Sequence, residues 1–270
     1  MTGGRDDQAM ADLLTATAAA VAEAFASHRL AASGTLRERG ERPGQYRLDL
    51  VADEAALGVL QSGGVGVLSE ESGLDDRGTG VVVVVDPVDG STNASRGIPW
   101  YACSLCAVDE AGPWVALVAN LATGTCHEAV RGGGARRDGR PITVAGTRRL
   151  ADSVVVLNGH PAHHLGWRQY RALGATALDL CAVADGSVDA TIDCTVDALG
   201  PWDYLGAALV ITEAGGHIAD ARGRDLVALD HDARRTPVSA GTAELLEEAL
   251  AARASLDPQP VAPAGPTGAG

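Results

Sequence analysis

Two aspartates stand three residues apart in the segment Asp86-Pro87-Val88-Asp89-Gly90-Ser91-Thr92-Asn93, directly after a run of five valines. Carboxylates this close repel each other unless a cation lies between them, and Mg²⁺ prefers one or two such ligands while it keeps waters for a substrate phosphate. Gly90 permits a sharp turn, and the next residues can open a helix whose free N–H groups hold phosphate oxygens. The alternative is a plain surface turn, since Asp-Pro and Asp-Gly are turn formers. Because strand, carboxylates and amide-rich turn coincide, we favour a metal and phosphate site.

Three further acidic positions strengthen this interpretation. Glu70 follows the β-like run 65–68, so we expect it at the same sheet edge as Asp86 and Asp89. Asp203 follows Pro201-Trp202 at the start of an apolar helix, and Asp49 stands at the start of an earlier one. Taken alone, Glu70 fits a solvated loop, and the two helix-starting aspartates fit caps or dipole partners.

Hydrophobic periodicity predicts layered helices and sheets, an α+β half followed by an α/β half. The predicted helices span 8–30, 48–60, 162–172, 176–184, 202–214 and 242–252. The predicted strands span 65–68, 81–85, 101–108, 114–119, 126–131, 141–144, 153–157, 188–192, 217–220 and 237–240. We place a soft boundary near residue 150, with an N-terminal half 1–150 that carries most metal ligands, a C-terminal half 151–254, and a disordered tail 255–270. The glycine-rich stretch 132–139 follows a strand without leading into a helix, which favours a hairpin loop over a phosphate cradle.

Composition excludes several classes of function. The 270 residues are 46% hydrophobic, contain no lysine, and carry a formal charge of −14. Such acidity argues against binding to nucleic acid, which depends on basic patches. The polar N-terminus lacks the regions of a signal peptide, and no apolar run approaches the roughly 20 residues that span a bilayer. Five irregularly spaced cysteines fit reduced thiols, so we expect a cytoplasmic protein that does not bind membranes.

The chain resembles the inositol monophosphatase family of lithium-sensitive, magnesium-dependent phosphomonoesterases. Ser69-Glu70-Glu71 matches the family's Glu-Glu segment, and Asp86 through Asn93 matches its D-P-[IVL]-D-G-[ST]-x-N signature. Pro201-Trp202-Asp203 through Gly216 matches its W-D-x-x-A…E-A-G-G signature. The resemblance implies a layered α-β-α-β-α sandwich of the inositol monophosphatase and fructose-1,6-bisphosphatase type, and a homodimer.

The resemblance also implies roles for individual residues. Glu70, Asp86 and the Val88 carbonyl are the implied ligands of a first Mg²⁺, and Asp86, Asp89 and Asp203 those of a second. Glu70 also helps a weaker third ion, and Li⁺ inhibits. Two such cations clamp both oxygens of an in-line displacement.

Further roles concern the water and the substrate. Asp49, Glu70 and Ser91 orient or deprotonate the attacking water, with Asp53 as a less favoured choice than Asp49. The implied substrate-binding residues are Asp89, Gly90, Ser91, Thr92, Gly174, Ala175, Asp193 and Asp203. Asp197 is an alternative to Asp193 because the loop before Trp202 is lengthened.

The predicted activity is Mg²⁺-dependent hydrolysis of a small phosphorylated polyol or sugar, with inositol-1-phosphate as the leading substrate. Alternatives in the same class are fructose-1,6-bisphosphatase, histidinol-phosphatase and 3′-phosphoadenosine 5′-phosphate phosphatase. The short segment 48–53, which is closer to an archaeal-type variant, favours the first of these. An alternative from another class is a regulatory protein that keeps the fold and acts by binding a partner such as RNA polymerase.

Overall fold

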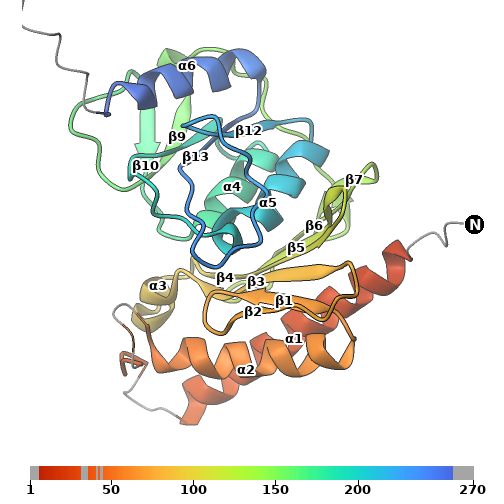
Figure 1. Ribbon diagram of the computed structural model, residues 1–270. Helices are drawn as coiled ribbons and strands as arrows, with labels where there is room; N and C mark the ends of the chain where they lie inside the picture. The colour runs from red at the N-terminus through yellow and green to blue at the C-terminus, as the bar shows by residue number, and fades with distance from the viewer. Residues whose placement is uncertain (1–5, 32–35, 41, 43–44, 258–270) are drawn as a thin grey trace, which may run out of the picture.

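The computed structural model describes residues 6–31, 36–40, 42 and 45–257. They form five layers in the order helix, sheet, helix, sheet, helix (Figure 1). This confirms the predicted α-β-α-β-α sandwich. Of the predicted disordered tail, 255–257 lie within the described residues, where they continue from the last helix, and 258–270 lie outside them.

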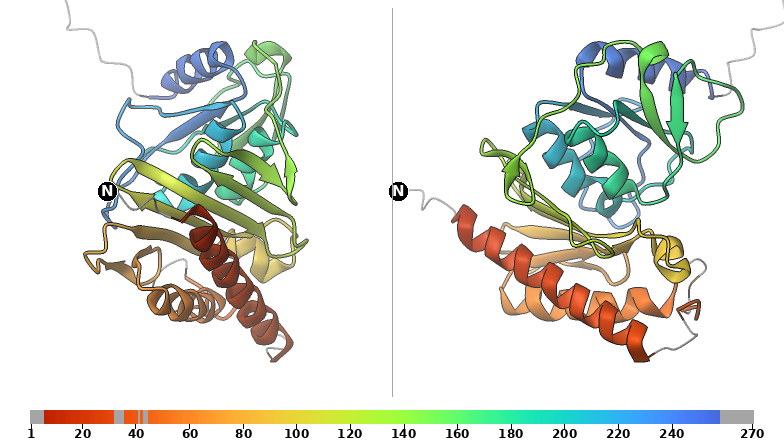
Figure 2. Two further views of the ribbon diagram at one scale, coloured as in Figure 1. Left: turned by 90° about the vertical axis from the view of Figure 1, so that its right-hand side faces the viewer. Right: turned by 180° about the vertical axis from the view of Figure 1, so that it is seen from behind.

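The first layer consists of α1 (Asp7–Ala31) and α2 (Arg47–Ser62), both at predicted positions. The apolar residues Met10, Leu14, Val21 and Phe25 recur at helical spacing along α1, and all four are buried in one core cluster with residues of α2 and the first sheet. Figure 2 shows α1 running obliquely beneath this sheet.

Within the described residues, α1 is also the one helix long and apolar enough to cross a membrane by length and composition, with a mean hydropathy of 1.4 over its best window. By length and hydropathy, α1 contradicts the prediction that no apolar run approaches the length of a membrane span. In the structure the apolar stripe of α1 faces protein, since Leu14 and Val21 are fully buried. We therefore assign α1 to the core of the fold.

The second layer is an eight-stranded sheet in the order β2-β1-β3-β4-β5-β6-β7-β8, in which only β1 and β3 pair in parallel. Its strands are β1 (Gly66–Ser69), β2 (Gly73–Asp75), β3 (Val82–Asp89), β4 (Ala102–Asp109), β5 (Gly112–Asn120), β6 (Cys126–Val130), β7 (Gly134–Arg137) and β8 (Arg140–Pro141). The short helix α3 (Ser91–Arg96) follows β3. The valine run is buried on both faces as predicted: Val83 and Val85 pack toward α1 and α2, whereas Val82 and Val84 pack toward the opposite layer.

The three remaining layers come from the second half of the chain. Between the sheets lie α4 (Thr176–Ala184) and α5 (Pro201–Glu213), which share a core cluster with the first sheet. The five-stranded sheet has the order β10-β9-β11-β13-β12 and consists of β9 (Val154–Asn158), β10 (Gln169–Arg171), β11 (Ala190–Asp193), β12 (His217–Asp220) and β13 (Pro237–Ala240). The 3₁₀ helix η1 (Leu150–Asp152) precedes it, and α6 (Ala243–Ala254) covers its outer face.

The helix predicted at 162–172 is wrong, because this region is irregular and ends in the edge strand β10. Aromatic contacts replace helical ones there: the His164 and Trp167 rings lie 4.4 Å apart, and those of Trp167 and Tyr170 lie 5.8 Å apart. The glycine-rich stretch forms the hairpin of β7 and β8, which agrees with the interpretation as a hairpin loop.

The first sheet ends at Pro141 and the second begins at Val154, on either side of the predicted boundary at residue 150. The two halves nevertheless share a hydrophobic core, because α4 and α5 of the second half pack on the first sheet. A division into separately folding domains at 150 stays a prediction. All five cysteines are free, and Cys103 and Cys106 lie in different core clusters on opposite faces of β4.

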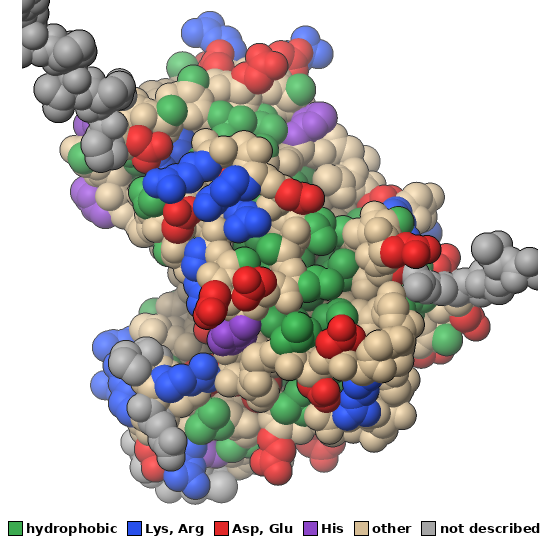
Figure 3. All heavy atoms as spheres, in the orientation of Figure 1, with side chains coloured by type: hydrophobic (Ala, Val, Ile, Leu, Met, Phe, Trp, Pro, Cys, Tyr) green, Lys and Arg blue, Asp and Glu red, His purple; other side chains and the backbone are tan. Residues whose placement is uncertain are grey.

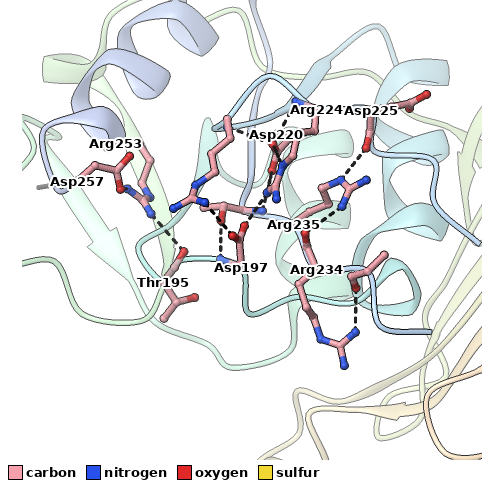
Figure 4. Close-up of polar contacts among 12 residues, drawn as sticks. Thr195, Asp197, Asp220, Arg224, Asp225, Arg234, Arg235, Arg253 and Asp257 are labelled. Carbon is pink, nitrogen blue, oxygen red and sulfur yellow. Dashed lines mark hydrogen bonds and ion pairs between the residues drawn. The ribbon is translucent and has the colours of Figure 1, made fainter. Parts of the chain in front are cut away.

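The buried guanidinium of Arg253 fastens α6 to the end of β11 (Figure 4). Its Nε donates to the Asp193 carbonyl at 2.5 Å, and Nη2 donates to the Thr195 carbonyl at 3.2 Å. We expect Arg253→Ala to lower the free energy of unfolding by about 3 kcal/mol, because it removes buried packing and leaves carbonyls without donors. Urea unfolding followed by circular dichroism measures this change.

Arg148→Ala is the matched control. Arg148 is 72% exposed in its side chain and pairs with Glu244 at 3.6 Å. We expect this substitution to change the free energy of unfolding by less than about 0.5 kcal/mol. Equal effects of the two substitutions would contradict the role given to Arg253.

Candidate active site

The predicted acidic residues approach one another where β1 and β3 end beneath the start of α5. A pocket of about 280 Å³ opens there, lined by Arg42, Gln45, Asp49, Glu70, Glu71, Ser91, Trp202, His231 and Arg234. Figure 3 shows the surface hollowed between the two sheets, with basic and acidic side chains gathered around the hollow.

Asp86, Asp89 and Asp203 form the centre of the site. Each offers a carboxylate oxygen, and these oxygens lie within 4.8 Å of one another. The pairing of β3 with β4 shifts register between Asp86 and Asp89, so Pro87 and Val88 leave the regular ladder. This irregularity lets both aspartates face one side, whereas a regular strand would turn residues three apart to opposite faces.

Backbone donors from three elements hold these carboxylates. Asp86 accepts from the Val88 N–H at 3.0 Å within the irregular segment. Asp89 accepts from the Ala177 N–H at 2.7 Å, which is a free donor of the first turn of α4. Asp203 accepts from the Gly200 N–H at 2.7 Å and so closes the start of α5. Asp203 therefore does cap the start of α5, as considered above. The same hydrogen bond holds its carboxylate beside Asp86 and Asp89.

Glu70 and Asp49 complete the acidic group. Glu70 directly follows β1, its N–H donates to the Val85 carbonyl at 3.2 Å, and its side chain bonds to that of Asp86. Asp49 lies in the first turn of α2, where Oδ2 accepts from the Tyr46 N–H at 2.8 Å. The other oxygen of Asp49, Oδ1, is buried without a hydrogen-bond partner.

Burial raises the pKa of every carboxyl in this group. It raises the pKa of Asp49 to about 8 and that of Asp89 to about 7, and with the nearby charge of Glu71 it raises the pKa of Glu70 to about 7. Burial, followed by repulsion from Glu70, also holds the pKa of Asp86 and of Asp203 well above the ordinary value. Without a cation, the pocket thus retains protons at neutral pH.

These residues fit a magnesium site. The donors are oxygens alone, they come from buried carboxylates that repel one another, and Asp49 Oδ1 lacks a partner. A divalent cation would replace the retained protons and satisfy the oxygens, and hard oxygen donors select Mg²⁺ or Ca²⁺ over softer metals. Asp86, Asp89 and Asp203 are positioned to hold one ion, and Glu70 lies next to Asp86 for another.

The position of Gly90 leaves no room for a side chain. Its φ is +85°, and an added Cβ would lie 3.1 Å from the carbonyl oxygens of Trp100 and Gly174 and 3.0 Å from the Ala175 Cβ. The predicted residues Gly174 and Ala175 therefore lie directly against the turn that follows Asp89. Asn93 fixes this contact, since its Nδ2 donates to the Trp100 carbonyl at 2.8 Å and to the Leu173 carbonyl at 2.7 Å.

Ser91 and Thr92 differ in placement. Ser91 lines the pocket together with Asp49 and Glu70. The Thr92 hydroxyl lies 3.3 Å from that of Tyr46, so its side chain connects α3 to the start of α2. Thr92 does not line the pocket, and its contact with substrate stays a prediction.

The predicted hydroxyl-binding carboxylates do not line this pocket. Asp193 Oδ1 accepts from Asn158 at 3.1 Å and from the Thr195 N–H at 2.9 Å, and Oδ2 is buried without a partner. Asp193 borders a separate small cavity with Thr176. The alternative, Asp197, pairs with Arg222 at 2.9 Å and with Arg224 at 2.6 Å (Figure 4).

Asp53 has a different task from Asp49. Its carboxylate accepts from the hydroxyls of Ser69, at 2.5 Å, and of Ser72. The Ser69 hydroxyl in turn accepts from the Glu71 N–H at 3.0 Å. Asp53 therefore holds the turn that carries Glu70, and it does not line the pocket.

The sequence interpretation missed six lining residues as site residues: Arg42, Gln45, Glu71, Trp202, His231 and Arg234. Glu71 accepts hydrogen bonds from both Arg42 and Gln45. Far along the chain, His231 Nε2 lies 3.0 Å from the Glu70 carbonyl, and its ring lies 4.9 Å from that of Trp202. The basic residues within 231–235 were the one sequence signal that could have indicated this side of the pocket.

The fold and the acidic cluster define a class of metal-dependent phosphatase, and comparisons with known proteins agree. The chain belongs to the inositol monophosphatase family, whose model matches residues 6–256. A protein named fructose-1,6-bisphosphatase/inositol-1-monophosphatase from Methanothermobacter thermautotrophicus is 34% identical over 236 residues, covering 75% of this chain and 81% of that one. A Nus factor SuhB from Xylella fastidiosa is 31% identical over 179 residues, covering 61% and 64%.

The fold comparison points the same way. A solved structure of a hypothetical Pyrococcus horikoshii protein with similarities to inositol-1 monophosphatase matches with a TM-score of 0.76 at 27% identity. The match covers 86% of this chain and 94% of that one. The chain is thus a phosphoric monoester hydrolase of this family.

The raised pKa values predict how the stability of the metal-free protein depends on pH. Asp49, Glu70 and Asp89 have folded-state pKa values of about 8, 7 and 7, above their ordinary values near 4, so folding retains protons that the unfolded chain releases. This stabilisation is complete below about pH 4 and is lost as pH rises through 7 to 8. In EDTA we expect the melting temperature to fall by about 5 °C or more between pH 5 and 8.

Differential scanning fluorimetry measures this fall. Mg²⁺ is expected to reduce it, because a bound cation replaces the protons, and Asp49→Asn is expected to make it shallower. A melting temperature that stays level or rises with pH in EDTA would contradict the electrostatic account.

Proposed function

We propose that this protein is a Mg²⁺-dependent hydrolase of small phosphomonoesters and that inositol-1-phosphate is its leading substrate. The observation that supports it is the convergence of Asp86, Asp89 and Asp203 within 4.8 Å, beside Glu70. Glu70, Asp86 and the Val88 carbonyl would hold one ion, and Asp86, Asp89 and Asp203 another. A third ion beside Glu70 and inhibition by Li⁺ belong to the same proposal.

In this mechanism bound Mg²⁺ would supply positive charge to the oxygens of the phosphate and of the leaving group. The chain's own residues would handle the water and its proton. Asp49 is suited to accept that proton at Oδ1, because the residue lines the pocket and this oxygen has no other partner. The Ser91 hydroxyl would orient the water toward phosphorus, and the Gly90 and Ser91 amides would donate to phosphate oxygens.

The substrate side would lie along Gly174 and Ala175, which contact Gly90. Asp193 and its unpartnered Oδ2 would approach a substrate hydroxyl only after a change in its surroundings, because the small cavity that it borders is separate from the pocket. We keep Asp193 as the hydroxyl-binding candidate in preference to Asp197, which two arginines already engage.

Fructose-1,6-bisphosphate is the second candidate substrate. Two observations favour it: the short segment 48–53 near the start of α2, and the archaeal relative whose name carries both activities. Nothing in the pocket favours histidinol phosphate or 3′-phosphoadenosine 5′-phosphate.

A regulatory role as a protein-binding member of the family is the alternative from another class, and the relative named as a Nus factor motivates it. The acidic group is intact in this chain, which supports catalysis. A charge of −14 speaks against direct binding of RNA. Co-purification of a partner by a chain that releases no phosphate would favour this alternative over hydrolysis.

Phosphate release from a panel of phosphorylated metabolites tests the function. We expect turnover of inositol-1-phosphate with Mg²⁺, loss of turnover in EDTA, recovery when Mg²⁺ is returned, and inhibition by Li⁺ at millimolar order. Full turnover in EDTA, or none on any member of the panel with Mg²⁺, would sink the proposal.

Asp89→Asn tests the site in the same assay. It keeps the size of the side chain and removes its charge, so we expect kcat to fall by about 10³-fold or more with the fold retained. The matched control is Asp225→Asn, an exposed residue outside the pocket, which should leave kcat unchanged. An unaltered kcat of Asp89→Asn at saturating Mg²⁺ would remove Asp89 from the proposed ligands.

Two further parts of the proposal are a homodimer, which the family resemblance implies, and a cytoplasmic location, which the irregularly spaced cysteines and the polar N-terminus indicate. For the dimer, light scattering should give about twice the chain mass of 27.4 kDa. A single-chain mass at micromolar concentration would refute it. The reduced state of all five cysteines agrees with a cytoplasmic location, which fractionation of cells would check.

A further inference from the structure

We propose that Arg234 binds the second phosphate of a sugar bisphosphate and so raises kcat/KM for a sugar bisphosphate relative to the matching sugar monophosphate. This inference rests on the proposed function and adds a specificity residue to it. Arg234 lines the same pocket as Asp49, Glu70 and Ser91, but it comes from the loop before β13. It thus offers a positive group across a pocket whose reactive side is acidic.

The guanidinium of Arg234 is held in place before any ligand arrives. It lies 5.0 Å from the centre of the Trp202 ring, and Nη1 donates to the carbonyls of His231 at 2.7 Å and Ala233 at 2.8 Å. Figure 4 shows the side chain directed away from the network of Asp197, Asp220 and Arg224. A planar group fixed by stacking and two carbonyls loses little conformational freedom when it binds an anion.

Arg234 also keeps its charge available. Arg42, the other arginine of the pocket, pairs with Glu71, and Arg224 pairs with Asp197 at 2.6 Å and Asp220 at 2.8 Å. Among the described residues, no carboxylate lies within ion-pair distance of Arg234. Arginine presents paired N–H donors that match the oxygens of a phosphate. The N–H groups of Arg234 that do not bond the two carbonyls are therefore suited to bind a second phosphate.

The carboxylates considered for binding substrate hydroxyls do not line the pocket beside Arg234. A polyol would be recognised by carboxylates that accept from its hydroxyls, but Asp193 borders another cavity and Asp197 is engaged by arginines. His231 and Arg234 line the pocket from the same loop, and the guanidinium of Arg234 carries a permanent positive charge. A sugar with one phosphate at the acidic cluster and another at Arg234 would satisfy both ends.

A competing role is purely electrostatic. The positive charge of Arg234 lowers the pKa of Glu70 and of Asp203, so it favours their ionised forms without touching substrate. That role would affect every substrate alike, because the acidic cluster is common to all of them. The two roles therefore differ in how the effect of a substitution depends on the second phosphate.

Fructose-1-phosphate and fructose-1,6-bisphosphate provide the matched pair, since they share the phosphate to be cleaved and differ by the second one. We would measure kcat/KM for both with the full-length wild type and with Arg234→Gln. The ratio of kcat/KM for the bisphosphate to that for the monophosphate is expected to fall about 30-fold, equivalent to about 2 kcal/mol, mainly through KM. Arg234→Lys should recover part of the ratio, because it keeps the charge and loses the paired donors.

Arg131→Gln is the control, since its Nη2 pairs with Asp109 at 2.9 Å on the first sheet and it does not line the pocket. It should leave the ratio within about twofold of the wild type. An Arg234→Gln protein that melts like the wild type and has an unchanged ratio would overturn the inference, including the case of equal losses on both substrates. A wild type that releases no phosphate from either sugar or from inositol-1-phosphate would instead refute the proposed function itself.

Discussion

The repulsion between buried carboxylates governs this structure. Asp86, Asp89 and Asp203 bring their oxygens within 4.8 Å of one another, with Asp86 and Asp89 buried and Asp203 half-buried. Both desolvation and repulsion oppose their ionised forms, so the site holds either protons or cations. The fold opposes this cost with directed donors, and each comes from a different element: the irregular end of β3, the first turn of α4 and the first turn of α5. These elements must meet at one point, which explains why the site lies where the layers join.

The shared core makes that meeting possible. Alternate valines of β3 pack into two different hydrophobic clusters, one toward α1 and α2 and the other toward α4 and α5. The strand that presents Asp86 and Asp89 is thereby fixed from both sides. The helices that present Asp203 and the donor to Asp89 pack on the opposite face of the same sheet. The positions of the carboxylates in the acidic cluster therefore depend on the packing of both halves of the chain.

Much of this arrangement can be read from the sequence, because it depends on local patterns. The valine run, Gly90 and the helix start at Pro201 are short-range signals, and the structure realises each of them. The predictions that failed concern features that depend on tertiary contacts. Residues 162–172 carry helical spacing, yet His164, Trp167 and Tyr170 stack on one another and the segment ends in an edge strand. His231 and Arg234 line the pocket from a loop without periodicity, some 160 residues from Glu70, and only the folded chain brings them there.

The side-chain amide of Asn93 joins α3 to the carbonyls of Trp100 and Leu173, from different halves of the chain. The turn at Gly90, beside the proposed phosphate site, and residues 173–175, beside the proposed alcohol site, are therefore held together and would move together. Evolution cannot freely reshape residues 173–175 for a new alcohol, because any movement there is transmitted to the turn at Gly90. Substrate range in this lineage should change through segments that this amide does not join, such as the loop before β13 that carries Arg234.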